Sequence, residues 1–389
     1  MPAAEATTPV IRKTALNAVH RKMGAKMVEF NGWDMPVEYP SSGGIVAEHM
    51  AVRTGVGIFD VSHMGDIRLA GRGALKAVQH ISMNDAARLA VGQAQYSALL
   101  YPQGTFVDDV IVHRLGEEEY LLVINAGTRE KDFNWVRDNT RQFDCAVENL
   151  SDDFTQIAIQ GPKAVDLLQR MTDADLTKVK FYWVTRGTIL LPEKSMGRRL
   201  ADTLIARTGY TAEDGFEIYV PADEATGAAV WNRILEVGKE FGAVACGLGA
   251  RNTLRLEGKL PLYGHEISDT INVWEAGLDR FIKMEKPEFI GRDALEKAKA
   301  AELKRTLVGL EMIERGIGRD GYKVLDEGGK EIGYVTSGSP APFLKKNIAL
   351  AYVPPAFAEI GSKVRVEIRG QGVGAQVVPT PFYKRPKKS

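Results

Sequence analysis

Apolar residues recur at two different spacings along this chain of 389 residues, and the spacings predict a mixture of helices and strands. A period of three to four residues runs from Val230 to Leu235 and predicts a helix that Asp223 begins. Further helices are predicted at residues 14–25, 45–55, 129–143 with Thr128 as the N-cap, and 250–258.

Segments rich in β-branched and aromatic residues predict strands. The predicted strands comprise residues 58–71, 105–114, 119–126, 203–211 and 215–221; residues 157–172 predict a strand, a Gly-Pro break and a helix, and residues 30–44 a loop. Beyond about residue 300, short strands follow at close spacing, which favours a separate β-rich domain. Because strands and helices do not alternate steadily, the sequence predicts an α+β fold rather than a doubly wound sheet.

Composition narrows the classes of function. Lysine and arginine number 50, as do aspartate and glutamate, so the chain lacks the basic excess that is usual for a nucleic-acid-binding protein. No apolar run approaches the ~18 residues of a membrane span. Residues 1–13 contain neither an apolar signal core nor an arginine-rich presequence. We therefore expect a soluble protein that binds neither membrane nor nucleic acid.

Several familiar motifs are absent or lie in the wrong context. The two cysteines, Cys145 and Cys246, rule out a disulfide framework. None of the six histidines stands in a metal-binding spacing, so no metal is expected. Residues 316–321 match G-x-G-x-x-G, but a β-hairpin pattern follows them, whereas a dinucleotide site requires a helix. We expect a loop there and no bound flavin.

Asp108 and Asp109 are an unusual pair, because two adjacent carboxylates interrupt a β-rich segment. Side chains of consecutive strand residues point to opposite faces, and both faces of this segment are otherwise mainly apolar. At least one carboxylate would then be buried and would need a partner. The alternative is a bulge or a strand-end turn in which both carboxylates remain in water; the pattern does not decide between them.

Two further positions draw attention. Glu217 lies between Phe216 and Ile218 in a predicted strand, either as an outward-facing carboxylate or as a functional one. Arg251 falls in the first turn of a predicted helix, where a cation opposes the helix dipole. Either an anion holds Arg251 there or its placement is accidental.

The order and number of several segments give the chain a family resemblance. It resembles the aminomethyltransferases, or T proteins, of the glycine cleavage system from about residue 15 to residue 385. The segments that carry the resemblance are FNGWDMPVEY, EHMAVRTGVGIFDVSHMG, QYSALLYPQGTFVDDVIV, NAGTREKD, IQGP, TGYTAEDGFEI, CGLGARNTLRLEGKLPLYG, FIGRDAL and TSGSPAPFLKKNIALAYVP.

The resemblance implies a cloverleaf of three domains around a central folate cavity. The first two α+β domains are then discontinuous, which agrees with the lack of a visible linker, and the third is β-rich and barrel-like. The implied boundaries are residues 1–60 with 155–262, residues 61–154 with 263–298, and residues 299–389.

The resemblance also places the site residues. The key carboxylate of the family falls on Asp109 in VDDV, with Asp108 as its neighbour. The carboxylate that binds the pterin falls on Glu217, and the family arginine on Arg251. Positions near the folate match Tyr96, Met64, Asn125 and Tyr383, and the position where some members have tyrosine, four residues after the key aspartate, is His113.

The implied activity is one-carbon transfer in glycine catabolism. An aminomethyl group arrives on the dihydrolipoyl arm of the carrier H protein, and tetrahydrofolate, as co-substrate, takes the carbon as 5,10-methylene-tetrahydrofolate. The implied location is the cytoplasm of a bacterium or the mitochondrial matrix of a eukaryote. Two alternatives are less favoured. An oxidative demethylase module on the same scaffold usually carries a flavin domain, and no dinucleotide fingerprint in a suitable context is present here. A folate-binding protein without catalytic activity is disfavoured because Asp109, Glu217 and Arg251 are all retained.

Overall fold

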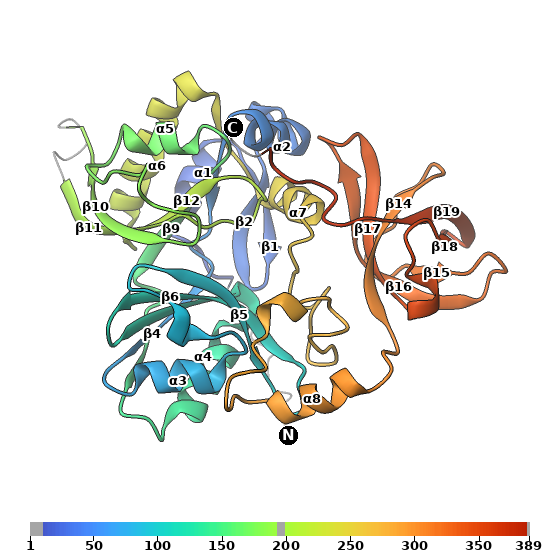
Figure 1. Ribbon diagram of the computed structural model, residues 1–389. Helices are drawn as coiled ribbons and strands as arrows, with labels where there is room; N and C mark the ends of the chain where they lie inside the picture. Colours follow the sequence, from blue (N-terminus) through green and yellow to red (C-terminus); the bar gives the residue numbers. More distant parts are fainter. Residues whose placement is uncertain (1–10, 193–198, 387–389) are drawn as a thin grey trace, which may run out of the picture.

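The computed structural model describes residues 11–192 and 199–386. The start of the chain, on which the expectation about a presequence rests in part, lies outside these ranges. Two open sheets and a closed barrel lie around a common centre in Figure 1, and helices cover the outer faces of the sheets. The predicted mixed α+β architecture with a β-rich C-terminal region is confirmed.

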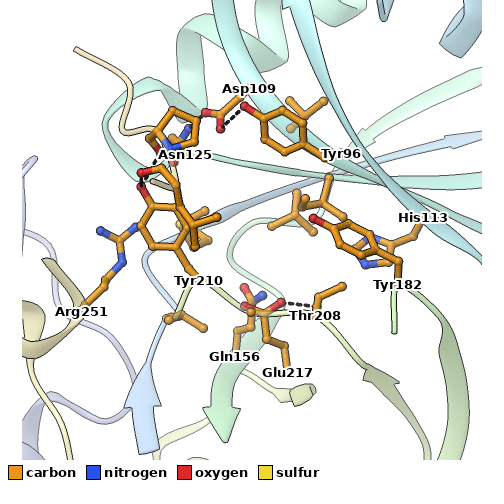
Figure 2. Close-up of a pocket in the computed structure, with 18 residues that line it drawn as sticks. Tyr96, Asp109, His113, Asn125, Gln156, Tyr182, Thr208, Tyr210, Glu217 and Arg251 are labelled. Carbon is orange, nitrogen blue, oxygen red and sulfur yellow. Dashed lines mark hydrogen bonds between the residues drawn. The ribbon is translucent and has the colours of Figure 1, made fainter. Parts of the chain in front are cut away.

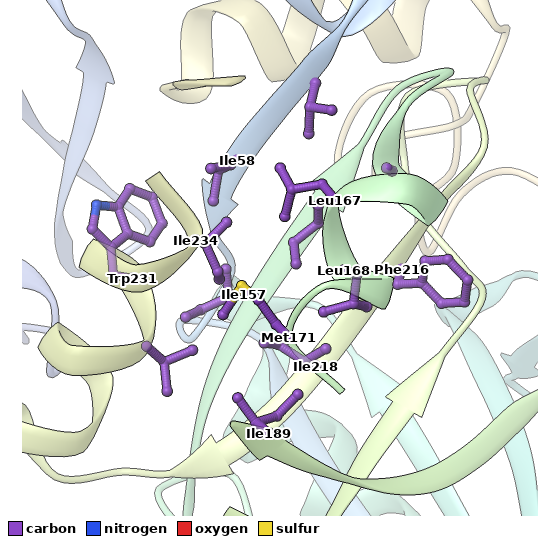
Figure 3. Packing of buried hydrophobic residues seen from close by; sticks show 14 of the residues in the cluster. Ile58, Ile157, Leu167, Leu168, Met171, Ile189, Phe216, Ile218, Trp231 and Ile234 are labelled. Carbon is purple, nitrogen blue, oxygen red and sulfur yellow. The ribbon is translucent and has the colours of Figure 1, made fainter. Parts of the chain in front are cut away.

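The first sheet has six strands in the order β10-β11-β12-β9-β3-β13. Their bounds are β3 (Val56–Asp60), β9 (Phe154–Gln160), β10 (Val184–Leu190), β11 (Arg199–Ala206), β12 (Gly215–Pro221) and β13 (Ala243–Ala245). Helices α5 (Ala164–Gln169) and α6 (Glu224–Gly238) pack on one face, and Asp223 caps α6 as predicted. Figure 3 shows the core between the sheet and these helices, where Ile234 of α6 lies near Ile157 of β9; Trp231 of α6 belongs to the same buried cluster.

The second sheet has five strands in the order β5-β6-β7-β4-β8. Their bounds are β4 (Gly65–Ala70), β5 (Ala94–Leu100), β6 (Phe106–Gly116), β7 (Glu119–Ile124) and β8 (Ala146–Asn149). Helices α3 (Ala74–Ile81) and α4 (Arg129–Thr140) pack against this sheet. Leu121 and Val123 of this sheet pack with Leu204 and Tyr219 of the six-stranded sheet, so the two sheets face each other.

The C-terminal region is a closed barrel in the order β14-β17-β16-β15-β18-β19, preceded by α8 (Arg292–Ala300). Its strands are β14 (Thr306–Met312), β15 (Lys323–Leu325), β16 (Glu331–Ala341), β17 (Lys346–Val353), β18 (Lys363–Ile368) and β19 (Gln371–Val378). Residues 316–321 lie between β14 and β15, outside any helix, as predicted. Helix α7 (Leu248–Glu257) contacts both β16 and α2 (Gly44–Thr54).

The prediction of a loop at residues 30–44 is wrong for its first part. Strands β1 (Lys26–Phe30) and β2 (Trp33–Glu38) form an antiparallel hairpin instead. Its two turn residues, Asn31 and Gly32, have φ of 50° and 81°, as a two-residue type I′ turn requires. The Asn-Gly pair was the available signal for this turn.

The prediction of one strand at residues 58–71 is also wrong. The chain leaves the six-stranded sheet at Asp60 and enters the five-stranded sheet at Gly65. The Asp60 carboxylate stabilises this crossing, because it accepts hydrogen bonds from the Ser62 amide (3.0 Å) and the Ser62 hydroxyl (2.6 Å). The helix predicted at residues 14–25 is shorter and spans α1 (Asn17–Lys22).

The sheets agree with discontinuous domains, since the strands of the six-stranded sheet come from residues 56–60 and 154–245. The exact predicted boundaries stay a prediction. In the ranges that the structure describes, no helix is long and apolar enough to cross a membrane.

The buried Asp60 carboxylate at the crossing between the two sheets should make the stability of the protein depend on pH. Asp60 and His20 form a fully buried pair (2.9 Å). Burial raises the pKa of Asp60, but hydrogen bonds from His20, Ser62 and Thr14 outweigh it and lower the pKa to about 2. Because the folded pKa lies below the unfolded value, the stabilisation is present above about pH 4 and disappears as the pH falls towards 2.

We expect Asp60→Asn to lower the free energy of unfolding by about 3 kcal/mol at pH 7 in urea titrations, with the difference shrinking as the pH falls from 4 to 2. Asp138→Asn is the matched control, because Asp138 pairs with Arg141 at the surface, where water screens the pair, and we expect it to change the free energy of unfolding much less than Asp60→Asn does. Equal costs for the two variants would contradict the assignment.

Candidate functional site

A cavity lies between the facing sheets and is closed by α7 and the segment that follows it (Figure 2). Residues from β5, β6, β7, β9 and β12 line it together with loop residues. The lining residues are Val61, Met64, Tyr96, Asp109, Val110, Ile111, His113, Val123, Asn125, Gln156, Tyr182, Thr208, Gly209, Tyr210, Glu217, Arg251, Leu260 and Pro261.

Asp109 points into the cavity from β6 and is held on both carboxylate oxygens. The Tyr96 hydroxyl donates to Oδ2 (3.0 Å), and the Asn125 amide donates to Oδ1 (2.8 Å). Burial and the neighbouring Asp108 raise the pKa of Asp109 to about 7, although both hydrogen bonds act in the opposite direction. Asp109 is therefore a fixed carboxyl group that can gain or lose a proton near neutral pH.

Asp108 lies on the other face of β6 and is fully buried, which decides between the two interpretations of the pair. Its carboxylate accepts hydrogen bonds from the Asn125 amide (2.8 Å), the Asp109 backbone (2.9 Å) and the Thr128 hydroxyl (2.6 Å). Thr128 is the N-cap residue of α4, as predicted, but its hydroxyl makes no capping hydrogen bond to the helix and donates to Asp108 instead. Asn125 bridges the two aspartates and aligns them.

Glu217 lies on β12, across the cavity from Asp109 (Figure 2). The Thr208 hydroxyl donates to its carboxylate. Burial raises the pKa of Glu217, while Thr208 and the charge of Arg251 act against this rise. Gly209, next to Thr208, has no room for a side chain, because a Cβ would lie 1.9 Å from Gln160 Oε1.

Arg251 comes from the first turns of α7, and its guanidinium stacks on the Tyr210 ring (4.5 Å to the centroid). The Tyr210 hydroxyl donates to the Pro261 carbonyl, which fixes the ring. Among the residues that the structure describes, no carboxylate lies within 4 Å of the Arg251 guanidinium. This cation faces the cavity and is available to a ligand.

The structure brings together six of the seven predicted site residues: Asp109, Glu217, Arg251, Tyr96, Met64 and Asn125. Tyr383 does not line this cavity. It stacks instead on Arg53 of α2 (3.9 Å), where the C-terminal segment returns from the barrel to the first sheet (Figure 1).

Sequence reasoning missed several lining residues. Tyr182 has a φ of 61°, an unfavourable conformation for a tyrosine, and hydrogen bonds through its backbone to Ala94 and Arg207 keep it there. Nothing in its local sequence marks it. Tyr210 and Thr208 lie in the conspicuous segment TGYTAEDGFEI, which was a usable signal. Gln156 is indistinguishable from an ordinary strand residue in the sequence, and His113 is marked only as the position where some family members have tyrosine.

The fold and the site together define a class: an α+β protein with a C-terminal barrel, whose cavity between two sheets presents two carboxylates and a cation. No group of three or more potential metal ligands occurs in residues 11–192 and 199–386.

Comparison with known proteins identifies the family. Residues 16–286 match the GCVT N-terminal domain, and residues 305–384 match the glycine cleavage T-protein C-terminal barrel domain. The chain therefore belongs to the glycine cleavage T-protein family, as its resemblance predicted. The aminomethyltransferase function in the glycine cleavage system is confirmed at this level.

Individual relatives agree. The aminomethyltransferase of Koribacter versatilis is 71% identical over 379 residues, covering 97% of this chain and 98% of the relative. That of Acidobacterium capsulatum is 64% identical, covering 97% of each. The crystal structure of the glycine cleavage system aminomethyltransferase T from Bartonella henselae matches with a TM-score of 0.87 and 33% identity, covering 96% of this chain and 98% of that one.

The environment of Asp109 generates a prediction about its titration. In the ligand-free protein we expect the Asp109 carboxyl carbon to titrate near pH 7 in NMR spectra of ¹³C-labelled aspartate. Tyr96→Phe removes a donor to the ionised form, so it should move this midpoint to higher pH. An Asp109 midpoint near 4, or one unaffected by Tyr96→Phe, would contradict this account.

Proposed function

We propose that the cavity binds tetrahydrofolate and that Asp109 serves the transfer of a one-carbon unit to it from an aminomethyl group on the dihydrolipoyl arm of the H protein. The products are 5,10-methylene-tetrahydrofolate, ammonia and the reduced carrier. The observation that carries the proposal is the position of Asp109, held by Tyr96 and Asn125 in the same cavity as Glu217 and Arg251.

Glu217 and Arg251 have complementary parts in binding. A buried carboxylate is a good acceptor for the amino group and ring N–H of a pterin. The Arg251 guanidinium, fixed by stacking on Tyr210, supplies a cation that orients the bound folate. Holding the folate in one orientation places N5 and N10 at the same end of the cavity as Asp109.

The chemistry that we propose balances without an oxidant or a metal. N5 and N10 each form a bond to the transferred carbon and lose one proton, while the carbon–sulfur and carbon–nitrogen bonds of the carrier break. Sulfur leaves as the thiol and nitrogen leaves as ammonia, and each takes up one proton. Positive charge develops on the carbon between these steps. The Asp109 carboxylate stabilises that charge and accepts a proton from N10.

The proposed partner is the H protein. It is the carrier with which the glycine cleavage T-protein family works, and we propose that it docks transiently. The relatives described above are bacterial, which supports the cytoplasm as the proposed place of action.

Asp109→Asn tests the central role. It removes the charge with little change of shape, so we expect ammonia release, with tetrahydrofolate and an aminomethyl-lipoyl carrier, to fall about 100- to 1000-fold. Asp108→Asn should cost less, because Asp108 does not face the cavity. Tetrahydrofolate at 100 times its Kd should still stabilise Asp109→Asn by about 2.7 kcal/mol, seen as a raised Tm. Near-normal turnover of Asp109→Asn would refute the assignment.

The carrier provides a second test. We expect the intact aminomethyl-loaded carrier to react far more efficiently per mole than a free aminomethyl-lipoyl compound, because docking delivers the arm to the cavity. If charge steers the encounter, the advantage should decline as salt rises. Equal efficiency of the two substrates at low and high salt would rule out a contribution from docking.

A further inference from the structure

Two buried polar side chains face the cavity at some distance from Asp109. His113 lies on the same face of β6 as Asp109, four residues further along, which corresponds to about 13 Å of strand. Gln156 lies on β9, next to the strand that carries Glu217. His113 is fully buried and Gln156 is 1% exposed, yet both line the cavity (Figure 2).

Neither ring nitrogen of His113 has a hydrogen-bond partner among the described residues. Besides burial, the backbone of Leu121, which is opposite His113 in the β6–β7 ladder, affects the pKa of His113 and raises it. Burial lowers the pKa of His113 to about 4, so the imidazole is neutral at pH 7 and offers one donor and one acceptor. A buried imidazole without partners is costly, and the cost is recovered if a ligand supplies the partners.

Gln156 has a similar unmet requirement. Its amide nitrogen donates to the Tyr219 hydroxyl (3.0 Å), which fixes the orientation of the amide. Its Oε1 is then left buried without a partner in the described part of the chain. This oxygen is an acceptor only, so a ligand group that satisfies it must carry an N–H or O–H.

We propose that His113 and Gln156 determine the specificity of the cavity for a pterin, because they form hydrogen bonds with the pyrimidine end of the bound pterin, beside Glu217. The inference rests on the proposed function, because it assumes that tetrahydrofolate occupies this cavity. A reduced pterin presents an amino group and ring N–H donors next to ring-nitrogen and carbonyl acceptors. The two acceptors Gln156 Oε1 and Glu217 take up N–H groups, and neutral His113 supplies the donor that an acidic pocket would lack.

The test measures binding of two folate fragments by calorimetry. His113→Phe and Gln156→Met remove the polar atoms and keep approximate size. We expect each to weaken binding of tetrahydrofolate and of tetrahydropterin about tenfold. Binding of p-aminobenzoyl-glutamate, which lacks the pterin, should not change. His113→Gln restores a donor and an acceptor, so it should bind tetrahydropterin more tightly than His113→Phe does. It also keeps the test valid if His113→Phe folds poorly.

His80→Phe is the matched control. His80 lies on α3 and packs against Phe143; its Nδ1 is also buried without a partner, but it does not line the cavity. Its variant should bind tetrahydrofolate like the parent protein. The inference is overturned if His113→Phe and Gln156→Met bind tetrahydropterin within twofold of the parent, or if they lose p-aminobenzoyl-glutamate to the same degree. If the parent protein itself fails to bind tetrahydrofolate, the proposed function fails first.

Discussion

The burial of a carboxylate between two sheets is the constraint around which the rest of the site is organised. A carboxylate removed from water is costly unless donors surround it. For Asp109 the donors come from β5 through Tyr96 and from the end of β7 through Asn125. These hydrogen bonds offset the cost of burying Asp109 only in part. Burial and the charge of the adjacent Asp108 together still raise the pKa of Asp109 to about 7. A group poised at neutral pH is what proton transfer needs.

The same constraint explains why so many polar contacts lie behind the cavity. Asp108 takes no part in lining it, yet it receives three hydrogen bonds and shares Asn125 with Asp109. Asn125 can bridge both carboxylates because it directly follows the end of β7, the strand that pairs with β6. The position of Asp109 therefore depends on a second, non-catalytic carboxylate and on the loop that leads into α4.

Helix α7 connects the cavity to the barrel. Arg251 faces the cavity, while Arg255, one turn later, pairs with Glu266 (2.8 Å) and bonds Ser337 of β16 (2.7 Å). Tyr352 of β17 donates to the Glu266 carbonyl (2.7 Å). The barrel thus holds the helix that supplies the cation, even though no barrel strand lines the cavity. The two sheets alone provide the carboxylates, and the third region helps to fix the arginine opposite them.

The α+β class, the β-rich C-terminal region and most of the local elements could be predicted from the sequence, because hydrophobic spacing and capping residues such as Asp223 act over a few residues. The family resemblance, which rests on the order and number of the matching segments, also indicated Asp109, Glu217 and Arg251 as site residues. The sequence did not reveal that Asp60 ends one sheet and Gly65 begins another, since a short polar interruption resembles continuous alternation. The orientation of Tyr182, the burial of His113 and Gln156, and the place of Tyr383 away from the cavity depend on contacts between residues far apart in the chain. Only the packing of one sheet against the other decided which polar side chains lost their water.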